Sequence, residues 1–166
     1  MGEPYSASNA AKAINVAWPN GLNCYSFAAR CRNPQGAGLI ACLPGAKAGA
    51  GVKQATLTAR SLVDACIADG FDYTGWGGGP PPACAASHYL VAVFMDARHS
   101  FHFARQDEIA KVRQWVHKPS AAQGAHNLQN NYLLGTDLSN VPWQPFTLIT
   151  YLRAPWAGVV VAKGNW

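Results

Sequence analysis

The chain has 166 residues, of which 49% are hydrophobic and 13% are charged. This composition supports a packed core and excludes an intrinsically disordered chain, which needs low hydrophobicity and a high net charge. No apolar run approaches the ~18 residues of a membrane-spanning helix, so no membrane span is expected. The net charge of +5 is too scattered to indicate a nucleic-acid partner. At this length we predict one domain covering residues 1–166.

The first part of the chain predicts two helices separated by a turn. A polar, Ala-rich stretch from Ser6 to Ala17 has the character of a short helix. The sequence Trp18-Pro19-Asn20-Gly21 is a strong turn signal, and residues 22–30 then show apolar positions at helical spacing. Cys24 is therefore expected at the start of a helix, directly behind a turn.

The middle of the chain predicts one long helix between two loops. Residues 35–54 and 71–87 are rich in Gly and Pro and are expected to form surface loops, the second with Trp76 among its glycines. Residues 55–70 carry a helical apolar stripe that ends at Gly70. The stripe consists of Leu57, Leu62, Val63, Cys66 and Ile67.

The second half of the chain predicts an antiparallel sheet. An apolar run at 88–95 indicates a central strand, and strands are also expected at 100–106, 111–117 and, after a polar loop, 145–152. Turns are expected at 96–99 and 106–108, and no element is assigned after Pro155. The predicted fold class is α+β, with N-terminal helices packed on an antiparallel β-sheet.

The candidate chemistry starts from Cys24. A thiol attacks as the thiolate, and a helix N-terminus or a neighbouring imidazolium lowers its pKa. His102 and His117 fall on consecutive predicted strands, where antiparallel pairing is expected to place them across from one another. We therefore predict Cys24 as nucleophile, His102 as base and His117 as the group that orients it. His102 could instead be an ordinary strand residue, since alternation puts it on the face opposite Phe101 and Phe103.

Several assignments around this triad stay open. His117 could be the base, with Asp137 or Asn140 as the third member. The backbone N–H of Cys24 is expected to hold the oxyanion, with Asn20 or Asn23 as a second donor.

The remaining cysteines and histidines predict no further chemistry. Cys31 and Cys66 lie on helical faces and are expected in the core, whereas Cys42 and Cys84 lie in loops and could form a disulfide. No metal site and no cofactor are expected, because the sequence has no CxxC or HxxxH pair. The other histidines, which are His88, His99 and His126, are expected at the surface.

Three pieces of the sequence resemble papain-fold hydrolases, notably the NlpC-like cell-wall peptidases and the CHAP amidases. Asn23-Cys24-Tyr25-Ser26-Phe27 is similar to the helix start that carries their nucleophile. Phe101-His102-Phe103-Ala104 resembles their base-bearing strand, and Gln114-Trp115-Val116-His117-Lys118-Pro119 resembles the strand with the orienting His. The chain departs from the NlpC-like pattern at Asn23-Cys24-Tyr25, where Asp-Cys-Ser is usual.

This resemblance implies a papain-like cysteine hydrolase that cleaves an amide bond through a Cys-His-His triad. The implied substrate is a peptidoglycan stem peptide or another peptide, and an immunity or inhibitor protein is a possible partner. Some type VI secretion effectors share this architecture and lack signal peptides. Since Met1-Gly2-Glu3-Pro4 does not begin a signal peptide, the expected location is outside the cell or in the periplasm without a cleaved leader, with the cytoplasm as the alternative. Two other functions remain open, namely a non-catalytic binding module of the same fold and a Cys-His acyltransferase or deamidase.

Overall fold

A computed structural model of the chain describes residues 22–36, 41–75, 80–109, 112–118, 126–127, 138 and 145–166. The predicted helix from Ser6 to Ala17 and the turn at 18–21 lie outside the described residues, as do Asn20, Trp76, Asp137 and Asn140. The description that follows concerns the described residues alone.

Two α-helices are present in this part of the chain. Helix α2 spans Cys24–Ala28, so the prediction that a helix starts at Cys24 is confirmed. Helix α3 spans Ala59–Asp69, and it starts later than predicted because Thr58 and Ser61 form a reciprocal capping box. The 3₁₀-helix η1, Gln54–Thr56, lies just before it.

The end of α3 and one face of it follow the prediction. Gly70 closes the helix in the left-handed conformation, with φ of 118°. Leu62 and Cys66 are fully buried, as expected from the stripe. Ile67 is 40% exposed, so its assignment to the buried stripe is wrong. Leu57 is buried, but it lies before the helix rather than on it.

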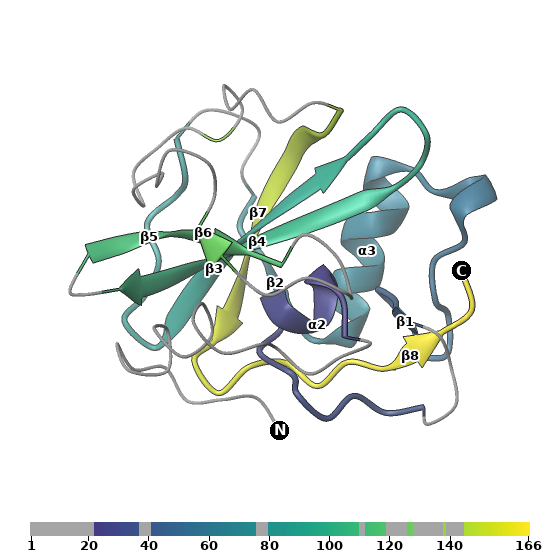
Figure 1. Cartoon of the computed structure of the whole chain (residues 1–166), viewed down its shortest axis with the longest axis horizontal. Coiled ribbons are helices and arrows are strands. Elements are labelled where there is room, and N and C mark those ends of the chain that lie inside the picture. The colour runs from purple at the N-terminus through teal and green to yellow at the C-terminus, as the bar shows by residue number, and fades with distance from the viewer. Residues whose placement is uncertain are drawn as a thin grey trace.

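A six-stranded sheet forms the centre of the molecule, in the order β2-β7-β3-β4-β5-β6 with every neighbouring pair antiparallel (Figure 1). A separate two-stranded sheet pairs β1 with β8. The described fold is therefore α+β, as predicted. The strands are β1 Ala41–Cys42, β2 Asp72–Tyr73, β3 His88–Met95, β4 Phe101–Ile109, β5 Val112–His117, β6 His126–Asn127, β7 Thr147–Pro155 and β8 Lys163–Gly164.

The strand predictions hold for β3 and need correction elsewhere. The turn predicted at 106–108 is wrong, because β4 continues to Ile109 and pairs with β5 over its whole second half. Gln106 and Asp107 are buried in this stretch and make hydrogen bonds there, so their polar character does not mark a turn. The last large strand starts at Thr147 rather than at 145 and runs on to Pro155.

The expected loops contain short elements that the sequence did not indicate. Residues 35–54 include β1 and the start of η1, and the loop at 71–87 begins with β2. The stretch after Pro155, which the sequence left unassigned, supplies β8 and a parallel bridge between Gln35 and Ala162.

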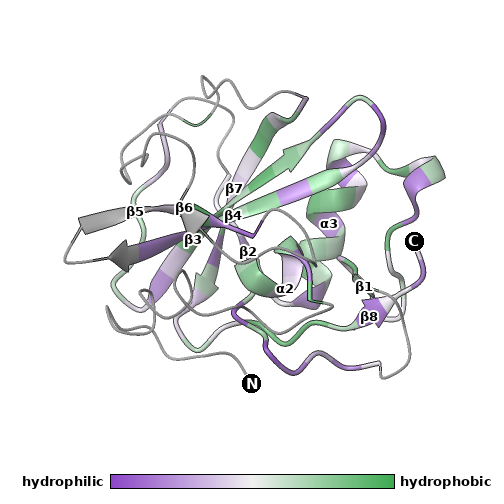
Figure 2. Cartoon of the chain, viewed as in Figure 1, coloured by the Kyte–Doolittle hydropathy of each residue, from purple (hydrophilic) through white to green (hydrophobic). Residues whose placement is uncertain are grey.

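Strand β3 is buried on both faces, which explains why it is apolar from Tyr89 to Met95. One face packs against α2 and α3 through Val91, Val93 and Phe103. The opposite face holds a second cluster that includes Phe94 and Trp115. Figure 2 shows the hydrophobic stretches on α3, β3 and β7 that meet in this interior. Neither described helix is long and apolar enough to cross a membrane.

Candidate active site

Helix α2 holds Cys24 against strands β4 and β5. Asn23 caps the helix, since its side chain accepts a hydrogen bond from the Ser26 N–H at 3.3 Å. The Asn23 Nδ2 donates to the carbonyl of Cys42 at 2.8 Å. The structure therefore places Asn23 as the cap that fixes the start of the helix, and its amide N–H is directed at β1 rather than at an oxyanion.

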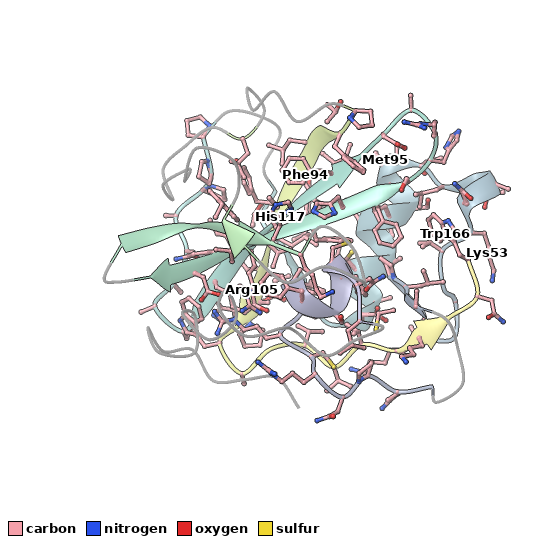
Figure 3. The ribbon with its side chains drawn as sticks, viewed as in Figure 1. Lys53, Phe94, Met95, Arg105, His117 and Trp166 are labelled. Carbon is pink, nitrogen blue, oxygen red and sulfur yellow. The ribbon has the colours of Figure 1, made fainter. Side chains whose placement is uncertain are left out.

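A buried hydrogen bond joins the two predicted catalytic histidines. His102 Nε2 and His117 Nδ1 lie 2.9 Å apart, and their rings are nearly perpendicular, with an angle of 82°. The side chains are only 4% and 5% exposed. His117 is labelled in Figure 3, at the end of β5 beside β4. The structure thus brings together two residues that the sequence paired.

The register of the pair differs from the prediction. His117 pairs with Ala104 and not with His102, so the two histidines are diagonal neighbours on one face of the sheet. Diagonal neighbours remain within reach of ring side chains. The expectation that they lie directly across from one another is therefore wrong by two residues, yet their contact is made.

The hydrogen bond couples the tautomers of the two rings. If His117 Nδ1 accepts, then His102 Nε2 carries the proton, and in the neutral ring His102 Nδ1 is the basic nitrogen. If His117 Nδ1 donates, the neutral His102 ring carries its proton on Nδ1 and cannot accept one there. A basic Nδ1 on His102 therefore requires His117 to be the Nε2–H tautomer.

The thiol of Cys24 is buried, with 6% of the residue exposed. Burial raises its pKa to about 12, and the backbone N–H groups of Phe103, Cys24 and Tyr25 and the charge of Lys118 offset this only in part. The prediction of a lowered thiol pKa is therefore wrong for the resting protein. The helix behind the thiol has only five residues, and the cost of desolvating a thiolate outweighs its effect.

The thiol lies beside the residues that directly follow the two histidines. Phe103 comes after His102 in β4, and Lys118 comes after His117 at the end of β5. His102 pairs with Phe94 and faces the second cluster, whereas Phe103 faces α2. Among the described residues, the Cys24 thiol makes its hydrogen bonds with backbone N–H groups and none with either imidazole. The imidazoles therefore lie on the face of the sheet opposite to α2, and the thiol approaches the same end of the β4–β5 pair from the other face.

A buried cluster of charges fastens α2 to the sheet. Arg30 Nη2 lies 2.8 Å from Asp107 Oδ1, and Arg105 Nη2 lies 2.9 Å from Asp107 Oδ2. Arg105 also donates to the carbonyl of Phe27 at 2.7 Å, and its guanidinium lies 3.9 Å from the centre of the Phe27 ring. Figure 3 shows Arg105 beside this helix. The Arg-x-Asp spacing in β4 is the sequence signal for this cluster.

Tyr25 ties the same helix to α3. Its hydroxyl donates to Asp69 Oδ2 at 2.7 Å, and its ring packs against Phe71 and Phe103. Sequence reasoning missed this contact, because nothing local relates Tyr25 to a carboxylate more than forty residues later.

The other predicted residues have structural roles or stand apart. Cys31 and Cys66 are buried, as expected, and all five cysteines are free thiols, so the disulfide between Cys42 and Cys84 is not formed. His88 is half-buried near Asp72, and His99 is exposed. The side chain of His126 lies outside the description. Within the described ranges no group of His, Cys, Asp and Glu could hold a metal ion.

Comparisons with protein-family models, with curated proteins and with solved structures found no match to this chain. The case for a function therefore rests on the residues and their geometry.

Proposed function

We propose that this protein is a papain-like cysteine hydrolase that cleaves an amide bond, in a peptidoglycan stem peptide or another peptide. The observation that carries the proposal is the buried hydrogen bond between His102 and His117 at the end of the strand pair on which Cys24 is packed. Two buried imidazoles in contact are costly to desolvate, and such an arrangement is typical of a base held by an orienting group. A peptidoglycan substrate implies delivery to the periplasm and an immunity protein as partner.

Each member of the triad has one task. His102 Nδ1 takes the proton of the Cys24 thiol, and Sγ attacks the amide carbonyl. His102 then gives the proton to the leaving amine, and water hydrolyses the thioester with the same residue as base. His117 keeps His102 in the tautomer whose Nδ1 is basic. The backbone N–H of Cys24 is the donor nearest to the developing oxyanion.

The buried thiol determines when the proton moves. Because the Cys24 pKa is raised to about 12, the resting nucleophile is the neutral thiol. Because His102 faces away from α2, proton transfer requires the thiol and the imidazole to come into contact at the end of β5 when the substrate binds, and catalytic contacts often tighten only in the substrate complex.

The test is digestion of purified peptidoglycan sacculi, with the products identified by mass spectrometry. Wild type should release new stem-peptide ends, Cys24→Ala should release none, and His102→Gln should lower the rate by about 10²–10⁴-fold. Cys84→Ala and His88→Gln are the matched controls, because both residues line a pocket beside Trp156 that includes none of Cys24, His102 and His117, and both variants should keep the wild-type rate. A panel of peptide amides covers the alternative that the substrate is another peptide.

Two outcomes contradict the proposal. One is cleavage by Cys24→Ala at the wild-type rate, which would place the chemistry elsewhere. The other is the absence of products from both sacculi and peptide amides with folded wild-type protein, which would favour a binding module of the same fold.

A further inference from the structure

Lys118 is a fully buried lysine directly after the orienting histidine. Its residue exposure is 0%, although lysine is almost never buried completely unless it is paired. Desolvation lowers the pKa of its ammonium, while the negative charge of a Cys24 thiolate acts in the opposite direction. The same coupling is present from the side of the cysteine, where Lys118 favours the thiolate. The Lys118 ammonium is therefore a buried cation whose charge acts on Cys24.

The other charged groups around α2 are bonded to partners other than Cys24. On the β4 side, the guanidinium groups of Arg30 and Arg105 are bonded to Asp107. On the α3 side, Asp69 accepts hydrogen bonds from Tyr25 and from the Gly45 N–H.

The groups that remain near the nucleophile lie at one end of the strand pair. They are the imidazoles of His102 and His117, which are bonded to one another, and the ammonium of Lys118. The register that pairs Ala104 with His117 places Lys118 level with Phe103, whose backbone N–H contacts the Cys24 thiol. Val116, two residues before Lys118, packs in the cluster around α2, so alternation along the chain puts Lys118 on the same side of the sheet as Cys24.

We propose that Lys118 stabilises the negative charge that forms at Cys24 Sγ when the thiol proton leaves for His102. Lys118 is then a positioning residue, which acts through the nucleophile and touches no substrate atom. A buried ammonium is effective here because the interior screens its charge far less than water does. The protonated Lys118 then shares the stabilisation of the thiolate with the imidazolium that forms at His102. The inference rests on the proposed function only in taking Cys24 as the nucleophile.

The test measures the thiolate directly and needs no substrate. The rate constant for alkylation of Cys24 by iodoacetamide is measured at pH 7, with the modified peptide quantified by mass spectrometry. Lys118→Met removes the charge and keeps the chain length, and it should lower this rate constant by about 10- to 1,000-fold, because the thiolate loses a nearby cation. Lys118→Arg keeps a cation and should restore most of the rate. Lys53→Met is the matched control, because Lys53 is exposed and donates to the Asn165 carbonyl.

A second measurement addresses a Lys118→Met variant that does not fold. Coupling between two groups is reciprocal, so a permanent negative charge at position 24 must change the titration of the ammonium. In Cys24→Asp the pKa of Lys118 should rise when followed by NMR of ¹³C-labelled lysine, whereas in Cys24→Ser, which is neutral like the resting thiol, it should stay at the wild-type value. An unchanged Lys118 titration in folded Cys24→Asp, or an unchanged alkylation rate constant in folded Lys118→Met, would overturn the inference.

These results are distinguishable from failure of the proposed function. If the sacculi and the peptide amides stay intact while Lys118→Met alkylates more slowly than wild type, the hydrolase proposal fails and the coupling between Lys118 and Cys24 stands. If wild type hydrolyses a substrate and Lys118→Met alkylates at the wild-type rate, the hydrolase proposal stands and the coupling fails.

Discussion

Asp107 lies between two guanidinium groups in the interior of the sheet, and this one carboxylate connects the strand to the helix that carries Cys24. The side chains of Arg30 and Asp107 are 1% and 0% exposed. A buried ion pair adds little compared with apolar packing, but the removal of one partner leaves a charge that water cannot reach. Replacing Asp107 should therefore lower the free energy of unfolding far more than the ion pairs themselves add to it.

The substitution Asp107→Asn should lower the free energy of unfolding by about 3–5 kcal/mol, because both arginines lose their shared carboxylate. Urea unfolding followed by circular dichroism measures the change. The control is Asp64→Asn, which removes an exposed carboxylate 3.5 Å from Arg60 and should cost only about 0.3–0.5 kcal/mol. Equal effects of the two substitutions would contradict the role given to Asp107.

Asp69 gives the stability a dependence on pH. Desolvation raises its pKa above the ordinary 3.8, since the hydrogen bonds from Tyr25 and Gly45 compensate only in part. Its Oδ1 is buried and has no hydrogen-bond partner. The folded protein therefore holds this proton more tightly than the unfolded chain does.

The sign of the effect follows from proton linkage. As pH rises from about 3.8 through the raised pKa, the unfolded state releases the proton more readily, and the contribution of Asp69 to stability falls. Asp69→Asn keeps an oxygen that can accept the bonds from Tyr25 and Gly45 and removes the titration. The unfolding free energy of the variant relative to wild type should therefore increase over this pH range, as measured by urea unfolding at a series of pH values. A difference that stays constant with pH would rule out a raised pKa for Asp69.

At the scale of elements, the start of α2 and the end of α3 are fixed by local chemistry. Asn23 and Thr58 supply N-caps, and Gly70 adopts a left-handed backbone that favours glycine. A Cβ at Gly70 would meet only Val159 Cγ1 at 3.6 Å, an ordinary contact. The backbone conformation, and not the available space, is therefore the reason for glycine at this position.

Replacing this glycine tests the point. Gly70→Ala should lower the midpoint of urea unfolding by the equivalent of about 1 kcal/mol, because alanine is strained at a φ of 118°. Gly51→Ala is the matched control, with a comparable contact of 3.5 Å to Ala46 and no positive φ. It should be neutral or stabilising by about 0.4–1 kcal/mol, because alanine restricts the unfolded chain. The same loss from both substitutions would point to crowding instead of backbone strain.

The elements that could be predicted from sequence are those with a strong local pattern. The apolar run of β3 and the start of α2 at Cys24 were predicted at the correct residues. The two-residue strands β1, β2 and β8 were missed, because they exist only through partners distant in the chain. The turn predicted at 106–108 failed because buried partners override the turn preference of polar residues.

Part of the candidate site could also be predicted from the sequence. The order of Cys24, His102 and His117 in the sequence was enough to pair the histidines, since antiparallel strands bring such positions together. The burial of the thiol and of Lys118 depends on the packing of α2 against β4 and β5, which no local pattern encodes. This is why the direction of the thiol pKa was predicted wrongly.

At the scale of the whole molecule, the core around α2 and α3 draws on elements from most of the described chain. Cys31, Cys42 and Cys66 come from three separate segments, yet all are 0% exposed in the same cluster. A single cooperative core should expose them together.

This cooperativity can be measured by pulsed alkylation in urea. Cys31, Cys42 and Cys66 should become reactive with one common midpoint, which coincides with the loss of circular dichroism. Cys84, which is only half-buried, should react well below that midpoint and serves as the internal reference. Separate midpoints for the three buried thiols would contradict the single domain predicted from the sequence.

The pairing of β1 with β8 has a consequence for the order of folding. Asn23, the cap of α2, donates a hydrogen bond to the Cys42 carbonyl. Cys42 in turn pairs with Lys163 of β8, which is distant in the chain. Contacts between such remote segments carry the largest loop-closure cost and tend to form late. A refolding chain is therefore expected to pass through a stage in which β3, β4 and β5 are paired while β1 and β8 are not, and in which the cap of α2 lacks its contact with the Cys42 carbonyl. Cys24 and the other four thiols are less protected at that stage, so reducing conditions should raise the yield of refolded protein.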